Sequence, residues 1–380
     1  MKKRIVTVMY DGTNYTLEWL RALIWAKDYF IKKNIIIEFE DGYNYELEHD
    51  NKKIYYKDDY KRIVERWRSK KYDVVLLAYH DVGILGEYKR RKELLPLLRK
   101  RVNWLVWLDT VDSSGTCNFD VLPYVDRYLK KQLLKDTSCY MDVLYGGRIY
   151  VDYYRKKFRV TDELFDNEKN GLVLDKIYLQ KLGLCWNRGL GDKFGLTKQE
   201  KTNYIDTCAP WKFHEVKKRK KYDIHYKVTI RNGAIAFQRQ RIKQLLEKCS
   251  WIRMPSIDKK IPYEEYIREF IDARAVISPF GWGEICYRDF DAFAYGITLI
   301  KPNMDHIKTY PNWYINGETY LSLNWDFSDF YDVMEYVCSG KNNDNLMRIA
   351  KKGQQLFKSK IDTCRGRDEF VKHFCFECKI

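Results

Sequence analysis

The sequence predicts an α/β protein with two domains, each built around a doubly wound parallel sheet. Three observations lead to this fold class. The chain has 380 residues, which is long for a single hydrophobic core. Short apolar runs of strand length alternate with amphipathic helical stretches in the first half. A second series of the same kind begins at Asp223.

The first half begins with a strand at residues 4–9, and a long helix follows it. Leu17, Leu20, Ile24 and Ile31 recur at helical spacing and predict the buried face of that helix. The next predicted elements are strands at 34–40, 72–78 and 104–108 and a basic helix near 88–102.

The loop DTVDSSGT at 109–116 follows a buried-looking strand and is expected to open toward a helix that ends in YLKKQLLKD. The periodic signal weakens after residue 150, and the basic run at 217–221 indicates a solvated connection between domains. The predicted domains are therefore 1–215 and 222–360. Helices near 327–339 and 342–361 are expected toward the C-terminus.

Residues 274–302 combine a strand, a glycine turn, a helix and a second strand. Gly281-Trp282-Gly283 can turn sharply, because glycine accepts a positive φ. Glu284 suits the first turn of the following helix, which a glycine ends before a strand resumes. Because this helix starts at the carboxyl end of a strand, its free amides and positive dipole end predict a site for a phosphate-type anion.

Arg288 and Asp291 are the two side chains of this helix with the most informative chemistry. They are three residues apart and share one face, so a guanidinium and a carboxylate can reach one crevice together. Arg288 can grip a pyrophosphate bidentately, and Asp291 can accept both hydroxyls of a ribose. The alternative is a plain intrahelical ion pair on a solvated face. The flanking glycine turn and second strand favour the nucleotide site.

A known motif shares several of these residues, namely Gly281-Trp282-Gly283-Glu284, Arg288, Phe290, Asp291, Ala292 and Gly296. Over about residues 222–302 the chain resembles the exostosin-like and related two-domain glycosyltransferases. The resemblance implies a GT-B fold, two Rossmann-like domains facing across a cleft, and sugar transfer from a nucleotide-diphosphate donor. It also implies that residues 361–380 pack back on the first domain. Asp291 stands where the family usually has Glu, and Gly283 stands where the retaining branch has Glu, which favours inversion.

Chemistry in such a fold takes place in the cleft. An inverting transferase needs a base for the acceptor hydroxyl and positive groups for the departing diphosphate. Asp112, with Asp109 beside it, is the predicted base, and a helix cap or Asx turn is the alternative role. Asp11 and His80 also lie at predicted strand ends. Arg288 is the predicted diphosphate cation, and the other predicted donor-site residues are Arg231, Arg239, Lys301, Asp305 and His306.

The net charge of the chain indicates which classes of binding partner to expect. Lys and Arg number 69 against 53 Asp and Glu, giving a formal net charge of +16 that attracts polyanions. The expected partners are a nucleotide sugar, a glycan or glycoconjugate acceptor, and peripherally an anionic membrane surface. No RNP-like strand, zinc-finger spacing or basic zipper converts the charge into base readout. Three alternatives to an inverting glycosyltransferase stay open. One is a basic nucleic-acid-binding protein, which is a different class of protein. The other two are a retaining transferase and an inactive sugar-binding relative.

No cofactor or metal is expected. Asp289 and Asp291 are two apart on a predicted helix and point apart, so they cannot hold one ion together. Cys375 and Cys378, with His373 nearby, form only a weak zinc pattern. The ten cysteines are expected as reduced thiols. No apolar stretch approaches the roughly 20 residues that span a bilayer, so a cytoplasmic protein, peripheral at most, is expected.

Overall fold

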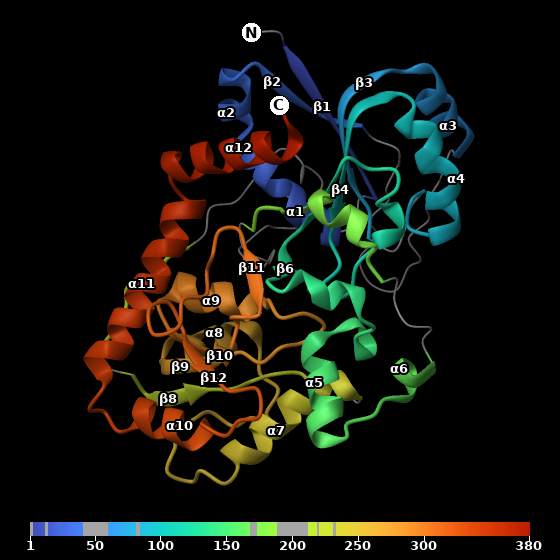
Figure 1. Ribbon diagram of the computed structural model, residues 1–380. Helices are drawn as coiled ribbons and strands as arrows, with labels where there is room; N and C mark the ends of the chain where they lie inside the picture. Colours follow the sequence, from blue (N-terminus) through green and yellow to red (C-terminus); the bar gives the residue numbers. More distant parts are fainter. Residues whose placement is uncertain are drawn as a thin grey trace.

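The first lobe of the computed structural model is built on a six-stranded parallel sheet (Figure 1). The structure describes residues 3–11, 14–40, 60–80, 84–167, 173–187, 212–218, 220–230 and 233–380. The order β2-β1-β3-β4-β5-β7 changes direction beside β1, so this sheet is doubly wound. Its strands are β1 (Arg4–Tyr10), β2 (Ile35–Glu40), β3 (Tyr72–Ala78), β4 (Val102–Asp109), β5 (Arg127–Lys130) and β7 (Leu182–Leu184).

The second lobe carries a smaller parallel sheet with the order β12-β10-β9-β8. Two parallel sheets in one chain confirm the predicted α/β fold class. The second sheet differs in detail, because its order runs in one direction only. Its strands are β8 (Tyr222–His225), β9 (Ala273–Ile277), β10 (Thr298–Pro302) and β12 (Leu321–Leu323).

The predicted long first helix is interrupted at Ala26, whose φ of −108° and ψ of 14° are not helical. Ile31, predicted on its buried face, is 56% exposed. The helices of the first half of the chain are α1 (Asn14–Trp25), α2 (Lys27–Lys32), α3 (Tyr60–Ser69), α4 (Tyr88–Arg99), α5 (Ile149–Phe158) and α6 (Glu163–Asn167). Those that follow are α7 (Phe237–Leu246), α8 (Tyr263–Ile271), α9 (Tyr287–Tyr295), α10 (Phe330–Cys338), α11 (Asn343–Ile361) and α12 (Cys364–Cys378).

The predicted helix ending in YLKKQLLKD was wrong, because this segment forms β5 and the short strand β6 (Gln132–Leu134). Its lysines and glutamine look like the polar face of a helix in the sequence. In the structure every residue from 128 to 134 is buried. Lys130 and Lys131 tolerate burial because Asp109 and Asp112 neutralise them.

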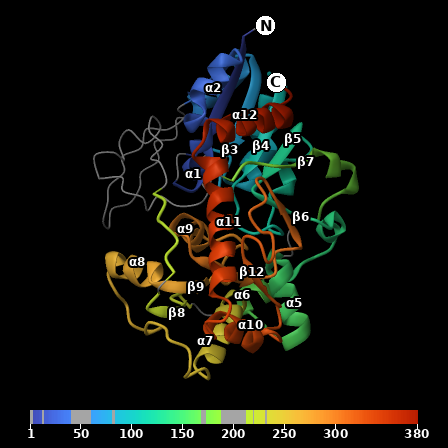
Figure 2. The same ribbon diagram turned by 90° about the vertical axis from the view of Figure 1, so that its left-hand side faces the viewer.

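Several contacts join the lobes. β6 pairs in antiparallel fashion with β11 (Ile307–Thr309) of the second half. α5, from the first half, packs on α7, where the rings of Tyr154 and Phe237 are 5.0 Å apart. α11 runs along both lobes and leads to α12, which lies against α2 (Figures 1 and 2). There the rings of Phe30 and Phe374 are 5.2 Å apart.

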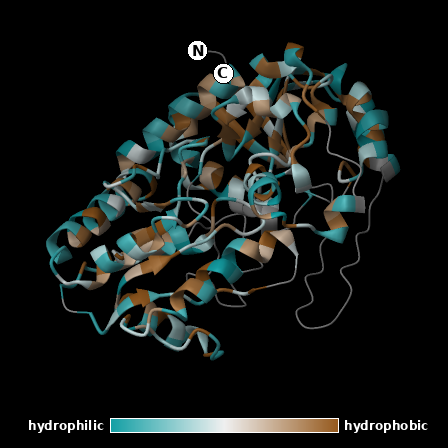
Figure 3. Cartoon of the chain, turned by 60° about the horizontal axis from the view of Figure 1, so that its bottom comes forward, coloured by the Kyte–Doolittle hydropathy of each residue, from teal (hydrophilic) through white to brown (hydrophobic). Residues whose placement is uncertain are grey.

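The main hydrophobic core surrounds the first sheet and continues across the junction into α9 and α11. A second core lies between the second sheet, α7 and α10. In Figure 3 apolar segments gather inside, and hydrophilic segments lie toward the outside. None of the described helices is long and apolar enough to cross a membrane.

Candidate functional site between the two lobes

The predicted glycine turn lies at the carboxyl end of β9 and touches the first lobe. The Tyr150 hydroxyl donates to the Gly281 carbonyl oxygen at 2.8 Å, and Arg148 Nε donates to the Trp282 carbonyl oxygen at 2.8 Å. A Cβ at Gly283 would stand 2.1 Å from the Asp112 carbonyl oxygen. Only glycine allows this approach, so the turn sequence brings the two lobes into backbone contact.

A pocket of about 340 Å³ opens beside this turn, large enough for a small ligand. Residues from both lobes line it. Arg239 provides a guanidinium, and the Trp282 side chain is 45% exposed. The other lining residues are Asp162, Leu164 and Phe165 from the first half and Thr229, Gly233, Ile235, Ala236 and Gly281 from the second.

Arg239 is fixed at the edge of the pocket by backbone oxygens. Its Nε donates to the Phe280 carbonyl oxygen at 3.0 Å, and its Nη1 donates to that of Thr229 at 2.7 Å. The Nη2 atom lies 2.5 Å from the position that a Cβ of Gly281 would take. Its glycine neighbour therefore leaves room for this cation at the pocket wall.

The pocket also contains a carboxylate, that of Asp162. Its Oδ2 accepts a hydrogen bond from the Ala234 amide at 2.7 Å, at the start of the helical segment that leads into α7. Because Asp162 already caps this amide, Arg239 rather than the helix start is the natural anchor for a phosphate here.

Arg288 is placed one loop away from the pocket. Its Nη2 donates to the Lys227 carbonyl oxygen at 2.8 Å, in the loop that also includes Thr229. The His225 imidazole is a neighbour, and burial, with the charges of Arg288 and Lys227, lowers its pKa to about 3. Arg288 therefore faces a neutral ring and supports the loop that borders the pocket.

Asp291 lies on the side of α9 that faces α8. It is 3% exposed. Burial, together with the charge of Asp291, raises the pKa of Tyr263 to about 12, which places the carboxylate near this ring. Neither Arg288 nor Asp291 lines the pocket, so the structure does not bring the predicted pair into it. Their predicted roles toward a nucleotide stay predictions.

Glu284 does not lie in the first turn of α9, which was the expectation. The helix begins at Tyr287 after Cys286, and Asp289 supplies the carboxylate of its capping box. Glu284 is fully buried and accepts hydrogen bonds from the Ser114 amide at 3.0 Å and from Gln132 Nε2 at 3.0 Å. It is thus a buried link between the lobes.

Replacing Glu284 by Gln is expected to lower the free energy of unfolding by about 2–5 kcal/mol, because buried donors lose a charged acceptor. Burial alone would raise the pKa of Glu284, but contacts with His306 and Ser114 lower it from 4.5 to about 2. A lowered pKa in the folded state contributes stability above about pH 4.5 that is lost as the pH falls toward 2.

Urea unfolding between pH 7 and pH 2.5 checks this expectation. The wild-type protein should lose stability more steeply below pH 4.5 than the Gln variant does. Glu247→Gln, an exposed carboxylate on the second lobe, serves as the control and should change neither the stability nor its pH dependence. Equal stability of the wild type and the Glu284 variant at pH 7 would contradict the assigned link.

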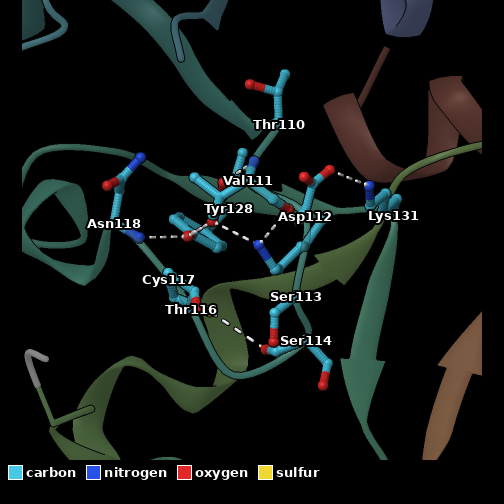
Figure 4. Close-up of polar contacts among 12 residues, drawn as sticks. Thr110, Val111, Asp112, Ser113, Ser114, Thr116, Cys117, Asn118, Tyr128 and Lys131 are labelled. Carbon is cyan, nitrogen blue, oxygen red and sulfur yellow. Dashed lines mark hydrogen bonds and ion pairs between the residues drawn. The ribbon is translucent and has the colours of Figure 1, made fainter. Parts of the chain in front are cut away.

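The predicted bases lie at the carboxyl edge of the first sheet. Asp109 is buried, accepts from the Tyr128 hydroxyl and pairs with Lys130 Nζ at 3.0 Å, so its carboxylate is fully engaged. Asp112 lies in the loop that faces the glycine turn, and its side chain is 50% exposed. Figure 4 shows its carboxylate beside Lys131. Of the two, Asp112 is the one that a substrate can reach.

Asp112 is held ionised. Burial alone would raise its pKa, but the charges of Lys131, His80 and Lys130 lower the pKa below its usual value. The other candidates at strand ends have structural contacts. Asp11 Oδ2 accepts from the His80 amide at 2.6 Å, and His80 Nδ1 lies 3.1 Å from Thr110 Oγ1.

The remaining predicted donor-site residues are dispersed. Lys301 is fully buried and pairs with Asp289 at 3.1 Å, so its ammonium supports the interior of the second lobe. His306 lies 3.8 Å from Glu284 and packs against Trp325 at a ring distance of 4.8 Å. Asp305 is exposed and bonds to Asn303. Arg231 lies outside the described residues.

No group of three or more potential metal ligands occurs among the residues that the structure describes. In the weak zinc pattern, Cys378 is buried and His373 Nε2 lies 2.7 Å from the Leu184 carbonyl oxygen. His373 also stacks on Tyr310 at a ring distance of 3.7 Å. These contacts are those of packed structural side chains.

Sequence reasoning missed the contributions of the first half to the pocket. Arg148 lies over the Trp282 ring at 5.3 Å and orients it. Asp162, Leu164 and Phe165 come from a stretch whose sequence is polar and without clear periodicity. They reach the site through the tertiary contact with α7, and the local sequence pattern does not predict that contact.

The chain is similar to solved structures, but no comparison with known proteins assigns it to a family. No protein-family model matches the sequence, and a search of curated proteins finds no match. Membership of the exostosin-like family therefore stays a prediction.

Among solved structures, the chain is similar to a glycosyltransferase from Rickettsia africae, with 10% identity, 100% of both chains covered and a TM-score of 0.45. It is also similar to the lipopolysaccharide outer core galactosyltransferase WaaB, with 10% identity over 98% of this chain and 99% of that one and a TM-score of 0.49. A third is an alpha-glucosyltransferase in complex with UDP and a 13-mer DNA, with 9% identity over 98% and 99% and a TM-score of 0.45. Similarity at this level transfers neither substrates nor residue roles.

Proposed function

We propose that the chain is a glycosyltransferase that moves a sugar from a nucleoside-diphosphate donor to an acceptor hydroxyl. One observation carries the proposal. A pocket with a guanidinium, a carboxylate and an exposed indole lies beside a glycine turn whose other side touches the loop of an ionised aspartate. Phosphates, hydroxyls and a nucleobase are the groups that such a set recognises together.

In this proposal, Arg239 binds the diphosphate, with Arg288 holding the neighbouring loop in place. Asp162 offers carboxylate oxygens to hydroxyls of the ribose or the sugar. The exposed indole of Trp282 stacks on the base, with the Arg148 guanidinium behind it. The chemistry that the sequence suggested for Arg288 and Asp291 is therefore assigned to Arg239 and Asp162.

The proposed reaction inverts the anomeric centre. The acceptor oxygen attacks C1 of the sugar while its proton passes to the Asp112 carboxylate. The bond between C1 and the phosphate oxygen breaks, and the nucleoside diphosphate leaves with the electron pair. Arg239 stabilises the negative charge that develops on it. This chemistry has no step that requires a metal.

A thermal-shift screen tests the proposal. UDP, GDP, CDP, dTDP and ADP are each added at 1 mM to the protein, and at least one is expected to raise the melting temperature, because it binds only the folded state. Inorganic phosphate at the same concentration is the control. No shift with any nucleoside diphosphate would contradict the proposal. The acceptor, a hydroxyl of a glycan, glycoprotein or lipid-linked sugar, follows from product analysis with the nucleotide that binds.

Two alternatives have separate tests. A nucleic-acid-binding protein would bind DNA or RNA with a steep loss of affinity in salt, and nucleotide sugars would not compete. A retaining transferase would give a product with the anomeric configuration of the donor. The pocket beside the glycine turn favours the transferase over the nucleic-acid binder, because its volume of about 340 Å³ suits a small ligand.

Replacing Trp282 by Ala is expected to weaken binding of the nucleotide found in the screen by about 3- to 10-fold, because a stacking contact of about 0.5–1.5 kcal/mol is lost. Binding of inorganic pyrophosphate should not change. Trp251→Ala is the matched control, since Trp251 is 50% exposed in the second lobe and does not line the pocket. Titration calorimetry with both ligands gives the comparison, and equal nucleotide affinity of all three proteins would remove Trp282 from the site.

A further inference from the structure

A buried lysine lies directly behind the proposed base. Lys131 follows β5, and its side chain is 1% exposed. Its Nζ lies 3.1 Å from Asp112 Oδ1 (Figure 4). The same Nζ lies 5.0 Å from the centre of the Trp19 ring. Among the described residues, Asp112 is the one carboxylate within ion-pair distance of this ammonium.

The neighbouring ion pair of Lys130 and Asp109 differs in its exposure. Lys130 and Asp109 are both completely buried, and the Tyr128 hydroxyl and the Val111 carbonyl oxygen complete their contacts. That pair is closed to any substrate. In the second pair only the lysine is buried, while half of the Asp112 side chain is exposed. Oδ1 is thus held from behind, and no described residue bonds to Oδ2.

We propose that Lys131 is a positioning residue that fixes the Asp112 carboxylate through Oδ1, so that Oδ2 receives the proton of the acceptor hydroxyl. This role rests on the proposed function, in which Asp112 is the base. A buried ammonium is costly without a partner, so Lys131 also constrains Asp112 to this one rotamer.

Three side chains bring positive charge to Asp112. Lys131 and Lys130 approach from β5 and its end, and His80 approaches from the end of β3. The second lobe brings the backbone of Gly283 against Asp112 and the Glu284 carboxylate against Ser114 of the same loop. Burial favours the protonated acid and these cations favour the carboxylate. Removal of Lys131 is therefore expected to let burial prevail and to raise the pKa of Asp112.

The test measures the protonation of Asp112 directly. A diazoacetamide esterifies only protonated carboxyl groups, and peptide mass spectrometry then gives the labelled fraction of Asp112 between about pH 2.5 and pH 7, a range that begins below the lowered pKa of Asp112. In Lys131→Met the labelling midpoint is expected at a pH higher than in wild type by about one unit or more. Lys131→Arg keeps the charge and should keep the wild-type curve. Lys135→Met, an exposed lysine nearby, is the control.

An unchanged labelling curve in Lys131→Met would overturn the proposal. Lys131→Gln gives the same readout if the Met variant does not fold, as judged by circular dichroism. With an assay for transfer, the acid limb of the kcat/KM profile should move in parallel with the labelling curve. If Asp112→Asn transfers sugar at the wild-type rate, the base assignment falls and this role of Lys131 falls with it. If Asp112→Asn is inactive but the labelling curve of Lys131→Met is the same as that of the wild type, only the role of Lys131 is overturned.

Discussion

Replacing Asp112 by Asn is expected to lower the rate of sugar transfer by about 10²- to 10⁴-fold, because an amide cannot take the proton of the acceptor hydroxyl. The donor site should be unaffected, because Asp112 is not among the residues that line the pocket. The expected pattern is a large fall in kcat with little change in nucleotide affinity. Initial rates with the donor found in the nucleotide screen provide the measurement.

The matched control is Asp142→Asn. Asp142 is an exposed aspartate of the same lobe and should be replaced without loss of rate. A wild-type rate in Asp112→Asn would remove this residue as the base and would leave His80 and Asp11 as the other acid–base groups at the same sheet edge. A loss of rate accompanied by a loss of folding would count against a purely chemical role.

Replacing Arg239 by Gln is expected to weaken binding of a nucleoside diphosphate by about 10- to 100-fold, since charged hydrogen bonds contribute about 1.5–3 kcal/mol. Binding of the corresponding nucleoside, which carries no phosphate, should change much less. The affinity of Arg239→Lys for the nucleoside diphosphate should lie between those of the wild type and Arg239→Gln. Lysine keeps the positive charge but lacks the parallel donors of the guanidinium. Calorimetric titrations of the three proteins measure these differences.

Arg241→Gln provides the control for Arg239. It lies on the same helix, α7, and does not line the pocket. The melting temperature of each variant must also be compared, because Arg239 supports the carbonyl oxygens of Thr229 and Phe280. Equal affinity of the Arg239 and Arg241 variants for the nucleoside diphosphate would contradict the assigned phosphate contact.

Local sequence patterns predicted most of the fold. The strand at 72–78 was recognisable because nearly all of its residues are apolar and buried. The glycine after α9 has a φ of 63°, as expected for a helix end. The segment 128–134 was misread, because its lysines are neutralised by Asp109 and Asp112 from a loop about 20 residues earlier. Pattern analysis treats such lysines as solvated.

The site was only partly predictable for the same reason. The glycine turn was found because its residues are contiguous. The reason given was wrong, since neither Gly281 nor Gly283 has a positive φ, and Gly283 is required instead by the close approach of the Asp112 backbone.

Arg288 and Asp291 share one helix, as expected, yet their neighbours are Lys227 and Tyr263 rather than the pocket. Helical spacing gives a common face but does not say which neighbouring element that face meets. The pocket walls from the first half depend on tertiary contacts.

The central claim is that the pocket between the lobes holds a nucleoside diphosphate. A crystal structure of the protein grown with UDP, and in parallel with GDP, tests it most directly. The diphosphate is expected within hydrogen-bond distance of Arg239 Nη2, beside Gly281, with the base against Trp282. A nucleotide bound elsewhere on the molecule, with this pocket still open, would contradict the account.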